Sequence, residues 1–137
     1  MGVFVQLHNL TDLGVLVLRL AIAAVFLVHG NYKWAMWKMQ PTPELPAPML
    51  KILRLLSICE PLGGVAMVLG FLTQLAALGL GIIMVGAIYT KRNKMKVPFA
   101  QQRSVGWEFD LILLAACVLL FFSGAGSYAI DSVWIGG

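Results

Sequence analysis

The sequence predicts an all-α integral membrane protein, a four-helix bundle with up-down topology and a tight hairpin between helices 2 and 3. Two observations carry this prediction. Of the 137 residues, 60% are hydrophobic and only 12% are charged, whereas a soluble domain has about 25% charged residues. The apolar residues also gather in stretches close to the roughly 20 residues that span a hydrocarbon layer. Residues 1–137 are therefore expected to form a single transmembrane domain.

Four apolar stretches are expected to cross the membrane, at about residues 10–30, 50–71, 73–90 and 106–123. Each should be helical, because lipid offers no hydrogen-bond partner to a backbone N–H or C=O group. A short turn separates the second stretch from the third, so these two should form an antiparallel hairpin. No Lys or Arg precedes the first stretch, unlike in a cleaved signal peptide, and we expect this stretch to be retained.

The basic residues concentrate in two connections, residues 31–54 and 91–105. Because Lys and Arg are enriched in cytoplasmic loops, both loops are predicted to be cytoplasmic and both termini to lie outside the plasma membrane. The net charge of +4 is therefore interpreted as a topology signal and not as a nucleic-acid-binding surface. The expected partners are the lipid bilayer and either other membrane subunits or further copies of the chain.

Arg19 and Glu60 are charged residues deep within the predicted spans. Counted from the same side of the membrane, Arg19 lies roughly 12 Å and Glu60 roughly 16 Å along its helix. We therefore expect an ion pair, because pairing would reduce the cost of burying either charge. Such a pair could join the first two helices, contact a substrate or cofactor, or belong to a proton relay.

A second group of polar and aromatic residues is expected at the cytoplasmic ends of the spans. Its members are His29, Tyr32, Tyr89, Trp107, Glu108 and Asp110. They could line a polar pocket in which a carboxylate shifts the titration of the histidine. Glu108 and Asp110 are two residues apart, so at most one should face His29. The alternative is an interfacial histidine with two solvated carboxylates at a helix N-terminus, where acidic groups are favoured in any case.

Pro61 follows Glu60 and should kink the second span, because proline removes a backbone donor; Gly63 and Gly64 come directly after it. The kink could free carbonyl groups for a ligand or serve packing alone. The sequence has no zinc-ligand spacing, phosphate loop or nucleophile motif. We therefore expect no metal, no cofactor of its own and no catalysis by this chain alone, although a quinone or lipid could bind at an interface.

Six ordered pieces of sequence cover nearly the whole chain. They are LRL at 18–20, VHG at 28–30, EPLGG at 60–64, GFLTQLAA at 70–77, GWEFD at 106–110 and GAGSYAID at 124–131. Together they resemble the DoxX family of small bacterial and archaeal membrane proteins. The chain departs from the family pattern at Gln74, where many relatives carry arginine, and at Ala125, where proline is common. The change at Gln74 would remove an anion contact.

The resemblance implies a four-helix membrane bundle and a loose link to oxidoreductase systems, since the family name comes from a quinone-linked thiosulfate-oxidising complex. The leading hypothesis is thus an accessory or anchoring subunit of a membrane oxidoreductase. A small transporter or proton pathway lined by Arg19, Glu60 and His29 is the second hypothesis. The third is a structural partner of other membrane helices.

Overall fold

In the computed structural model, the residues that the structure describes, 10–135, form helices joined by loops and contain no strand. The long helices are α2 (Thr11–Lys33), α3 (Ala47–Leu69), α4 (Thr73–Tyr89) and α5 (Glu108–Ser123). A 3-10 turn, Trp34–Trp37, follows α2, and a π-helical turn, Thr90–Lys94, follows α4. A short helix, α6 (Ile130–Ile135), lies after α5. The all-α prediction is confirmed for the described part of the chain.

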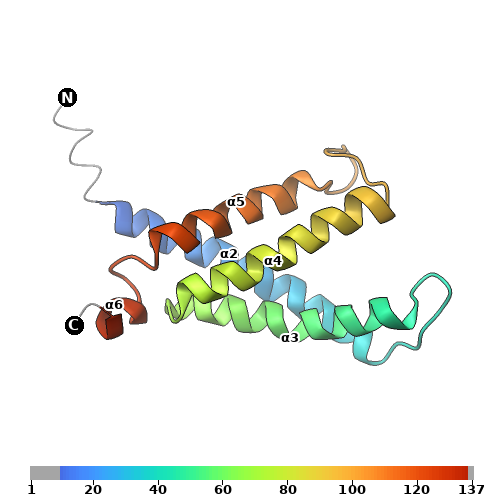
Figure 1. Cartoon of the computed structure of the whole chain (residues 1–137), viewed down its shortest axis with the longest axis horizontal. Coiled ribbons are helices and arrows are strands. Elements are labelled where there is room, and N and C mark those ends of the chain that lie inside the picture. Colours follow the sequence, from blue (N-terminus) through green and yellow to red (C-terminus); the bar gives the residue numbers. More distant parts are fainter. Residues whose placement is uncertain (1–9, 136–137) are drawn as a thin grey trace.

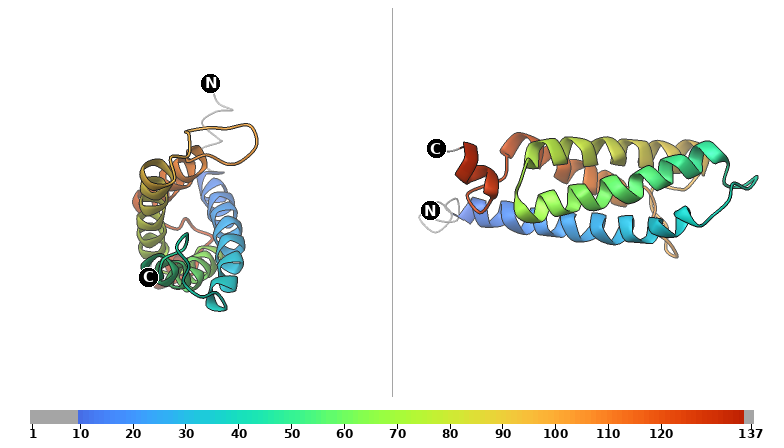
Figure 2. Two further views of the ribbon diagram at one scale, coloured as in Figure 1. Left: turned by 90° about the vertical axis from the view of Figure 1, so that its right-hand side faces the viewer. Right: turned by 90° about the horizontal axis from the view of Figure 1, so that it is seen from below.

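The long helices lie side by side (Figure 1), and the end-on view shows them arranged around a common interior (Figure 2). Going round the bundle, α2 packs on α3, α3 on α4, α4 on α5 and α5 on α2. The closest packing is within the pairs α2–α3 and α4–α5. The turn between α3 and α4 lies at the same end as α6, and the two longer loops lie at the other end (Figure 1).

The outer surface of this bundle is largely apolar, as a lipid-facing surface should be. Val17, Leu62 and Phe122 expose 60%, 65% and 78% of their surface. In the part of the chain that the structure describes, three helical segments are long and apolar enough to cross a membrane: Thr11–Trp37, Ala47–Leu69 and Thr73–Lys94. Helix α5 has 16 residues, fewer than the roughly 20 that cross a hydrocarbon layer untilted. Length and composition therefore indicate a membrane protein.

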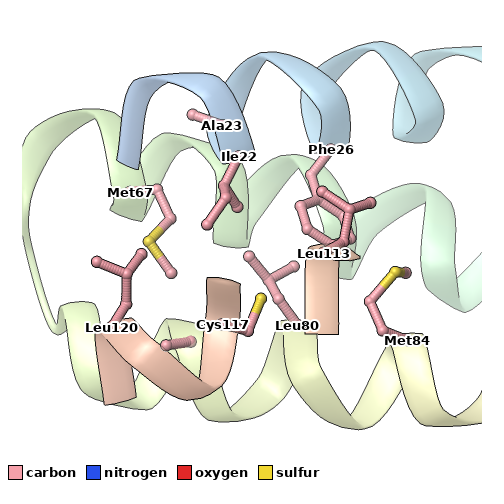
Figure 3. Close-up of a cluster of buried hydrophobic side chains, with 10 residues drawn as sticks. Ile22, Ala23, Phe26, Met67, Leu80, Met84, Leu113, Cys117 and Leu120 are labelled. Atoms are coloured by element: carbon pink, nitrogen blue, oxygen red, sulfur yellow. The ribbon is translucent and has the colours of Figure 1, made fainter. Parts of the chain in front are cut away.

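All four long helices contribute to one apolar core (Figure 3). Its members are Ile22, Ala23 and Phe26 of α2, Met67 of α3, Ala77, Leu80 and Met84 of α4, and Leu113, Cys117 and Leu120 of α5. On α4 and α5 these residues recur every three to four positions, so they fall on one face of each helix. The core is continuous along the interior of the bundle and ends where the charged residues begin.

Helix α3 ends at a glycine that allows the tight turn. Gly70 has φ +63°, and its N–H donates to the Ala66 carbonyl. This left-handed conformation at a helix C-terminus favours glycine, which lacks a Cβ. Only residues 70–72 separate α3 from α4, so the short connection follows the sequence prediction.

Pro61 lies within α3, which remains helical on both sides of it. Its ring packs against Gly30 of α2, where an added Cβ would lie 2.4 Å from the Pro61 Cδ atom. Gly63 faces Leu80 of α4, and Gly64 faces Leu27 of α2. The three residues predicted to form a kink are therefore positions where neighbouring helices approach α3 closely. These contacts favour the packing interpretation over a ligand site.

Candidate functional site

A buried carboxylate on α3 forms an ion pair with the last residue of α2. Glu60 is 1% exposed, and its Oε1 atom contacts the ammonium group of Lys33. The lysine side chain is 23% exposed, so its charge reaches from the end of the bundle into the interior. The Oε2 atom of Glu60 is buried and has no hydrogen-bond partner among the described residues. Such an oxygen can accept a proton or a hydrogen bond without first breaking the ion pair.

A second carboxylate–lysine pair lies on the other half of the bundle. Asp110 is 6% exposed in the first turn of α5. Its Oδ2 atom lies 2.7 Å from the ammonium nitrogen of Lys91, in the π-helical turn after α4. Each helix pair therefore has a buried carboxylate on one helix and a lysine at the end of the other.

Contacts made by neighbouring residues of α2 bring these two carboxylates to the same level of the bundle. Gly30 packs on Pro61, the residue after Glu60. The His29 ring stacks on Phe109, the residue before Asp110, with centroids 6.2 Å apart and ring planes at 25°. Both carboxylates are buried, so we define the site as the two pairs Lys33–Glu60 and Lys91–Asp110.

Apolar side chains close the interior next to this site. Phe26 and Leu113 lie together in the core, and Met84 approaches from α4 (Figure 3). Leu113 lies three residues after Asp110 on α5, so this part of the core adjoins the Asp110 end of the helix. The site is therefore polar toward the end of the bundle that carries the basic loops, and apolar toward its middle.

Arg19 does not pair with Glu60, in contrast to the prediction. The Arg19 side chain is buried and donates to three backbone carbonyls: Nε to Met67 (3.1 Å), Nη1 to Ala125 (2.6 Å) and Nη2 to Tyr128 (2.8 Å). Met67 is seven residues beyond Glu60, roughly 10 Å along a helix. Arg19 and Glu60 therefore lie at different levels of the bundle and have different partners.

The error arose from the register assumed for α2 and α3. The sequence estimate placed the start of α2 level with the turn after α3. In the structure the first turns of α2 extend past that turn and contact the segment after α5. Asp12 accepts a hydrogen bond from the Ser127 hydroxyl, and Val15 lies against Gly126. Arg19 consequently meets the end of α3.

Arg19 and Asp131 of α6 form a second polar centre, next to the turn between α3 and α4. Its carboxylate accepts the backbone N–H groups of Leu72 (2.7 Å) and Thr73 (2.8 Å), which begin α4. Burial alone would raise the pKa of Asp131, but those two donors and the Arg19 charge favour the carboxylate more strongly. The pKa of Asp131 is therefore below its usual value of 3.8. Arg19 and Asp131 together attach the segment after α5 to the bundle.

The residues predicted to line one polar pocket are dispersed. Tyr32 and Tyr89 expose 72% and 59% of their surface. Trp107 packs edge-on against Phe99, with centroids 4.6 Å apart. Asp110 alone among the six is buried. The six residues therefore do not line one pocket, because three of them are exposed, Trp107 and Glu108 are half-buried and Asp110 is buried.

The two other members of that predicted pocket make local contacts. His29 is exposed, and its Nδ1 atom lies 2.9 Å from the Val25 carbonyl of its own helix. The Oε1 atom of Glu108 accepts the Gly106 N–H at 3.3 Å. Neither side chain contacts the two carboxylate–lysine pairs directly in any recorded hydrogen bond or ion pair.

Sequence reasoning missed the roles of Lys33 and Lys91. Both were interpreted only as signals of membrane topology. A usable signal was present, because each lysine lies at the end of an apolar stretch whose neighbouring stretch contains an unpaired acidic residue. A long lysine side chain can extend along a helix end toward such a carboxylate.

An apolar groove of about 590 Å³ lies between α3 and α4. Gly63, Ala66, Ala76 and Gly79 line it together with larger apolar side chains. Small residues let another helix or a hydrocarbon chain approach closely in lipid. Cys59 also lines this groove, whereas Cys117 is in the core. Residues 10–135 contain no group of three or more His, Cys, Asp or Glu arranged to hold a metal ion.

Comparison with known proteins gives one family and two curated relatives. The model of the DoxX family matches residues 14–92. A Bacillus subtilis protein named "Putative oxidoreductase CatD" is 29% identical over 126 residues, covering 88% of this chain and 86% of that protein. A Haemophilus influenzae protein named "Uncharacterized protein" is 27% identical over 119 residues, covering 84% of this chain and 86% of that protein. No solved structure matches the chain.

Proposed function

The chain belongs to the DoxX family, and from this premise we propose that it is an accessory subunit of a membrane oxidoreductase. The observation that carries the proposal is the similarity, over 88% of the chain, to the protein named "Putative oxidoreductase CatD". In this role the chain binds another subunit that performs the redox reaction.

The α3–α4 groove supports such a role, because it offers a partner a shaped surface in the membrane. Leu62, Leu75 and Ile82 are each about two-thirds exposed and border the small residues of the groove. A transmembrane helix of a partner subunit, the tail of a quinone or a lipid chain would each bury these apolar groups. We assign the groove to a transmembrane helix of the partner subunit. The alternative occupant is a quinone tail or a lipid chain.

We further propose that α5 crosses the membrane together with the three longer helices, giving four crossings. Its core residues lie on the face toward α4, and its outer face is apolar, with Ile112 and Phe122 exposed. The basic loops are then cytoplasmic and both chain ends outside the plasma membrane. Asp110 at the start of α5 has its charge paired with Lys91, which lowers the cost of carrying it at the membrane edge.

Purification of the full chain from native membranes tests the subunit role. With an affinity tag and a mild detergent, the proposal expects a second chain with a redox cofactor to elute with the tagged protein. Gly79→Leu should reduce that second chain several-fold, because Gly79 lines the groove and has open space around it. Gly86→Leu is the matched control, since Gly86 lies on the same helix, also with open space, outside the groove. Elution of the tagged chain alone contradicts the subunit role.

A proton pathway is the second candidate function, and the Lys33–Glu60 pair favours it. A buried carboxylate with one unpartnered oxygen, held by a partly exposed lysine, can exchange a proton with the side that carries the basic loops. In reconstituted vesicles, Glu60→Gln should abolish proton flux, whereas Glu44→Gln, at an exposed loop carboxylate, should not alter it. Equal flux through wild type and Glu60→Gln removes this candidate.

A further inference from the structure

The connection between α4 and α5 contains a strongly basic segment whose charges are not neutralised. Residues 90–107 contain five basic and no acidic residues. Within residues 10–135, Lys91 is the only one of the five with a carboxylate partner, Asp110. Arg92, Lys94, Lys96 and Arg103 are exposed and form no recorded ion pair among the described residues. We call these four residues the basic platform.

The backbone of this connection is folded, so the platform is not a flexible tail. The N–H groups of Met95 and Val97 donate to the carbonyls of Thr90 (3.0 Å) and Lys91 (2.9 Å). The Glu108 N–H donates to the Phe99 carbonyl at 3.1 Å. These bonds tie the first part of the connection to the end of α4 and the last part to the start of α5.

One side chain of the platform is held by an aromatic ring, and another lies on an unusual backbone conformation. The Arg92 guanidinium lies over the Trp107 ring, 5.9 Å from its centroid, a cation–π contact. Lys96 has φ +55°, a left-handed conformation that a side chain rarely adopts and that glycine would adopt without strain.

The aromatic residues around the platform place it at the level of lipid headgroups. Tyr89 ends α4, and Trp107 directly precedes α5. Tyrosine and tryptophan are enriched at the boundary between hydrocarbon and water. The cationic groups that lie just beyond them are therefore at the depth of lipid phosphates.

The basic residues near the connection between α2 and α3 have different partners. Arg54 donates to the carbonyls of Met36 and Met39 and lies over Trp37. Lys33 is paired with Glu60. Lys38, in the loop, and Lys51, in the second turn of α3, are exposed, and the same loop carries the acidic Glu44. The uncompensated positive charge is therefore greatest on the α4–α5 connection.

From the charge, the ordered backbone and the depth we propose that the basic platform binds the phosphate headgroup of an anionic phospholipid. Clustered Lys and Arg next to a membrane helix attract anionic lipid, and guanidinium groups form paired hydrogen bonds with phosphate. The occupant is a lipid of the surrounding bilayer and not a free anion, because the platform adjoins the membrane along Tyr89 and Trp107. This binding is independent of the oxidoreductase role.

The test uses the purified full chain in an uncharged detergent, titrated with phosphatidylglycerol while the unfolding temperature is recorded. The wild type should be stabilised by phosphatidylglycerol and not by phosphatidylcholine. Lys94→Gln/Lys96→Gln should raise the half-saturating lipid concentration about 30-fold, since each basic residue near the surface contributes about a fivefold effect. The matched control, Lys38→Gln/Lys51→Gln, removes two exposed charges near the α2–α3 connection and should change the half-saturating concentration less than threefold.

The side chains of Lys94 and Lys96 make no recorded contact, so both variants should fold. Equal weakening in the two double variants contradicts a specific platform, because binding would then depend only on total charge. Equal stabilisation by phosphatidylcholine contradicts recognition of an anionic headgroup. Stabilisation of the wild type by inorganic phosphate, to the same extent as by phosphatidylglycerol, would identify a free-anion site and overturn the lipid assignment.

Discussion

The Glu60 carboxylate of α3 is held by the Lys33 ammonium group of α2, with one oxygen in the ion pair and the other buried without a partner. A buried ion pair is costly to break by removing one partner, because the remaining charge stays uncompensated. The interior of a bundle in lipid makes this asymmetry stronger than at a soluble surface.

Replacing Lys33 with Met should therefore destabilise the protein by about 3 kcal/mol, the low end of the effect for buried pairs, because Lys33 is partly exposed. The double variant Lys33→Met/Glu60→Gln should be more stable than Lys33→Met, because it removes the unpaired charge. The free energy of unfolding of each purified variant is measured in mixed micelles, with the helix content as the signal. Additive losses in the double variant would show that the two residues are not energetically coupled.

Arg19 should be required to hold the segment after α5 on the bundle. Its three hydrogen bonds to carbonyls involve a charged donor, so Arg19→Leu should cost at least about 3 kcal/mol. Amide hydrogen exchange in residues 124–135 should become faster than in the core helices. Arg54→Leu is the matched control, because Arg54 also donates to two carbonyls but at the opposite end. Unchanged protection of residues 124–135 in Arg19→Leu would refute this role.

Docking of α6 should weaken in acid. The pKa of Asp131 is lower in the folded protein than its usual value of 3.8, so the carboxylate stabilises the fold above about pH 4. This contribution decreases as the pH falls below 4 and is lost once the pH passes below the folded pKa. Pepsin cleavage near α6, measured between pH 5 and pH 2, should increase in the wild type. Asp131→Asn should be cleaved readily throughout, and a parallel pH response in both proteins would exclude Asp131 as the cause.

The contact between Gly30 and Pro61 should tolerate no side chain. A Cβ at residue 30 would lie 2.4 Å from the proline ring, so Gly30→Ala should push α2 from α3 and cost about 1–3 kcal/mol. Gly14→Ala is the matched control on the same helix, because no atom lies within 4 Å of its added Cβ. The control should be neutral or up to about 1 kcal/mol more stable. Equal melting temperatures for the two variants would disprove close packing at Gly30.

The sequence was sufficient to predict the helices because apolar stretch lengths and the Gly70 turn are local properties. The predicted stretches 73–90 and 106–123 differ from α4 and α5 by at most two residues at either end. The helical segment after the prolines was predicted to begin at 50, whereas α3 begins at Ala47, because proline is tolerated in the first turn of a helix.

The partners of the charged residues could not be predicted in the same way, because they depend on the register between helices. Glu60 was predicted as the neighbour of Arg19, but the observed neighbour is Met67, which lies two turns further along α3. Asp131 could not be identified as a cap of α4 either, since it is 58 residues from Thr73 and no periodicity relates them. Burial of Asp110 and exposure of Tyr89 likewise depend on how α4 and α5 rotate about their axes.

The central claim is a bundle embedded in lipid, with its basic loops at one membrane face and the Arg19–Asp131 end at the other. Single cysteines in a chain with Cys59→Ala and Cys117→Ala test it most directly, using a water-soluble maleimide that does not cross sealed vesicles. We predict that Lys94→Cys and Ser127→Cys are labelled from opposite sides, and that Ile82→Cys, on the apolar outer face of α4, remains unlabelled. Labelling of Ile82→Cys, or of the other two from the same side, would contradict the claim.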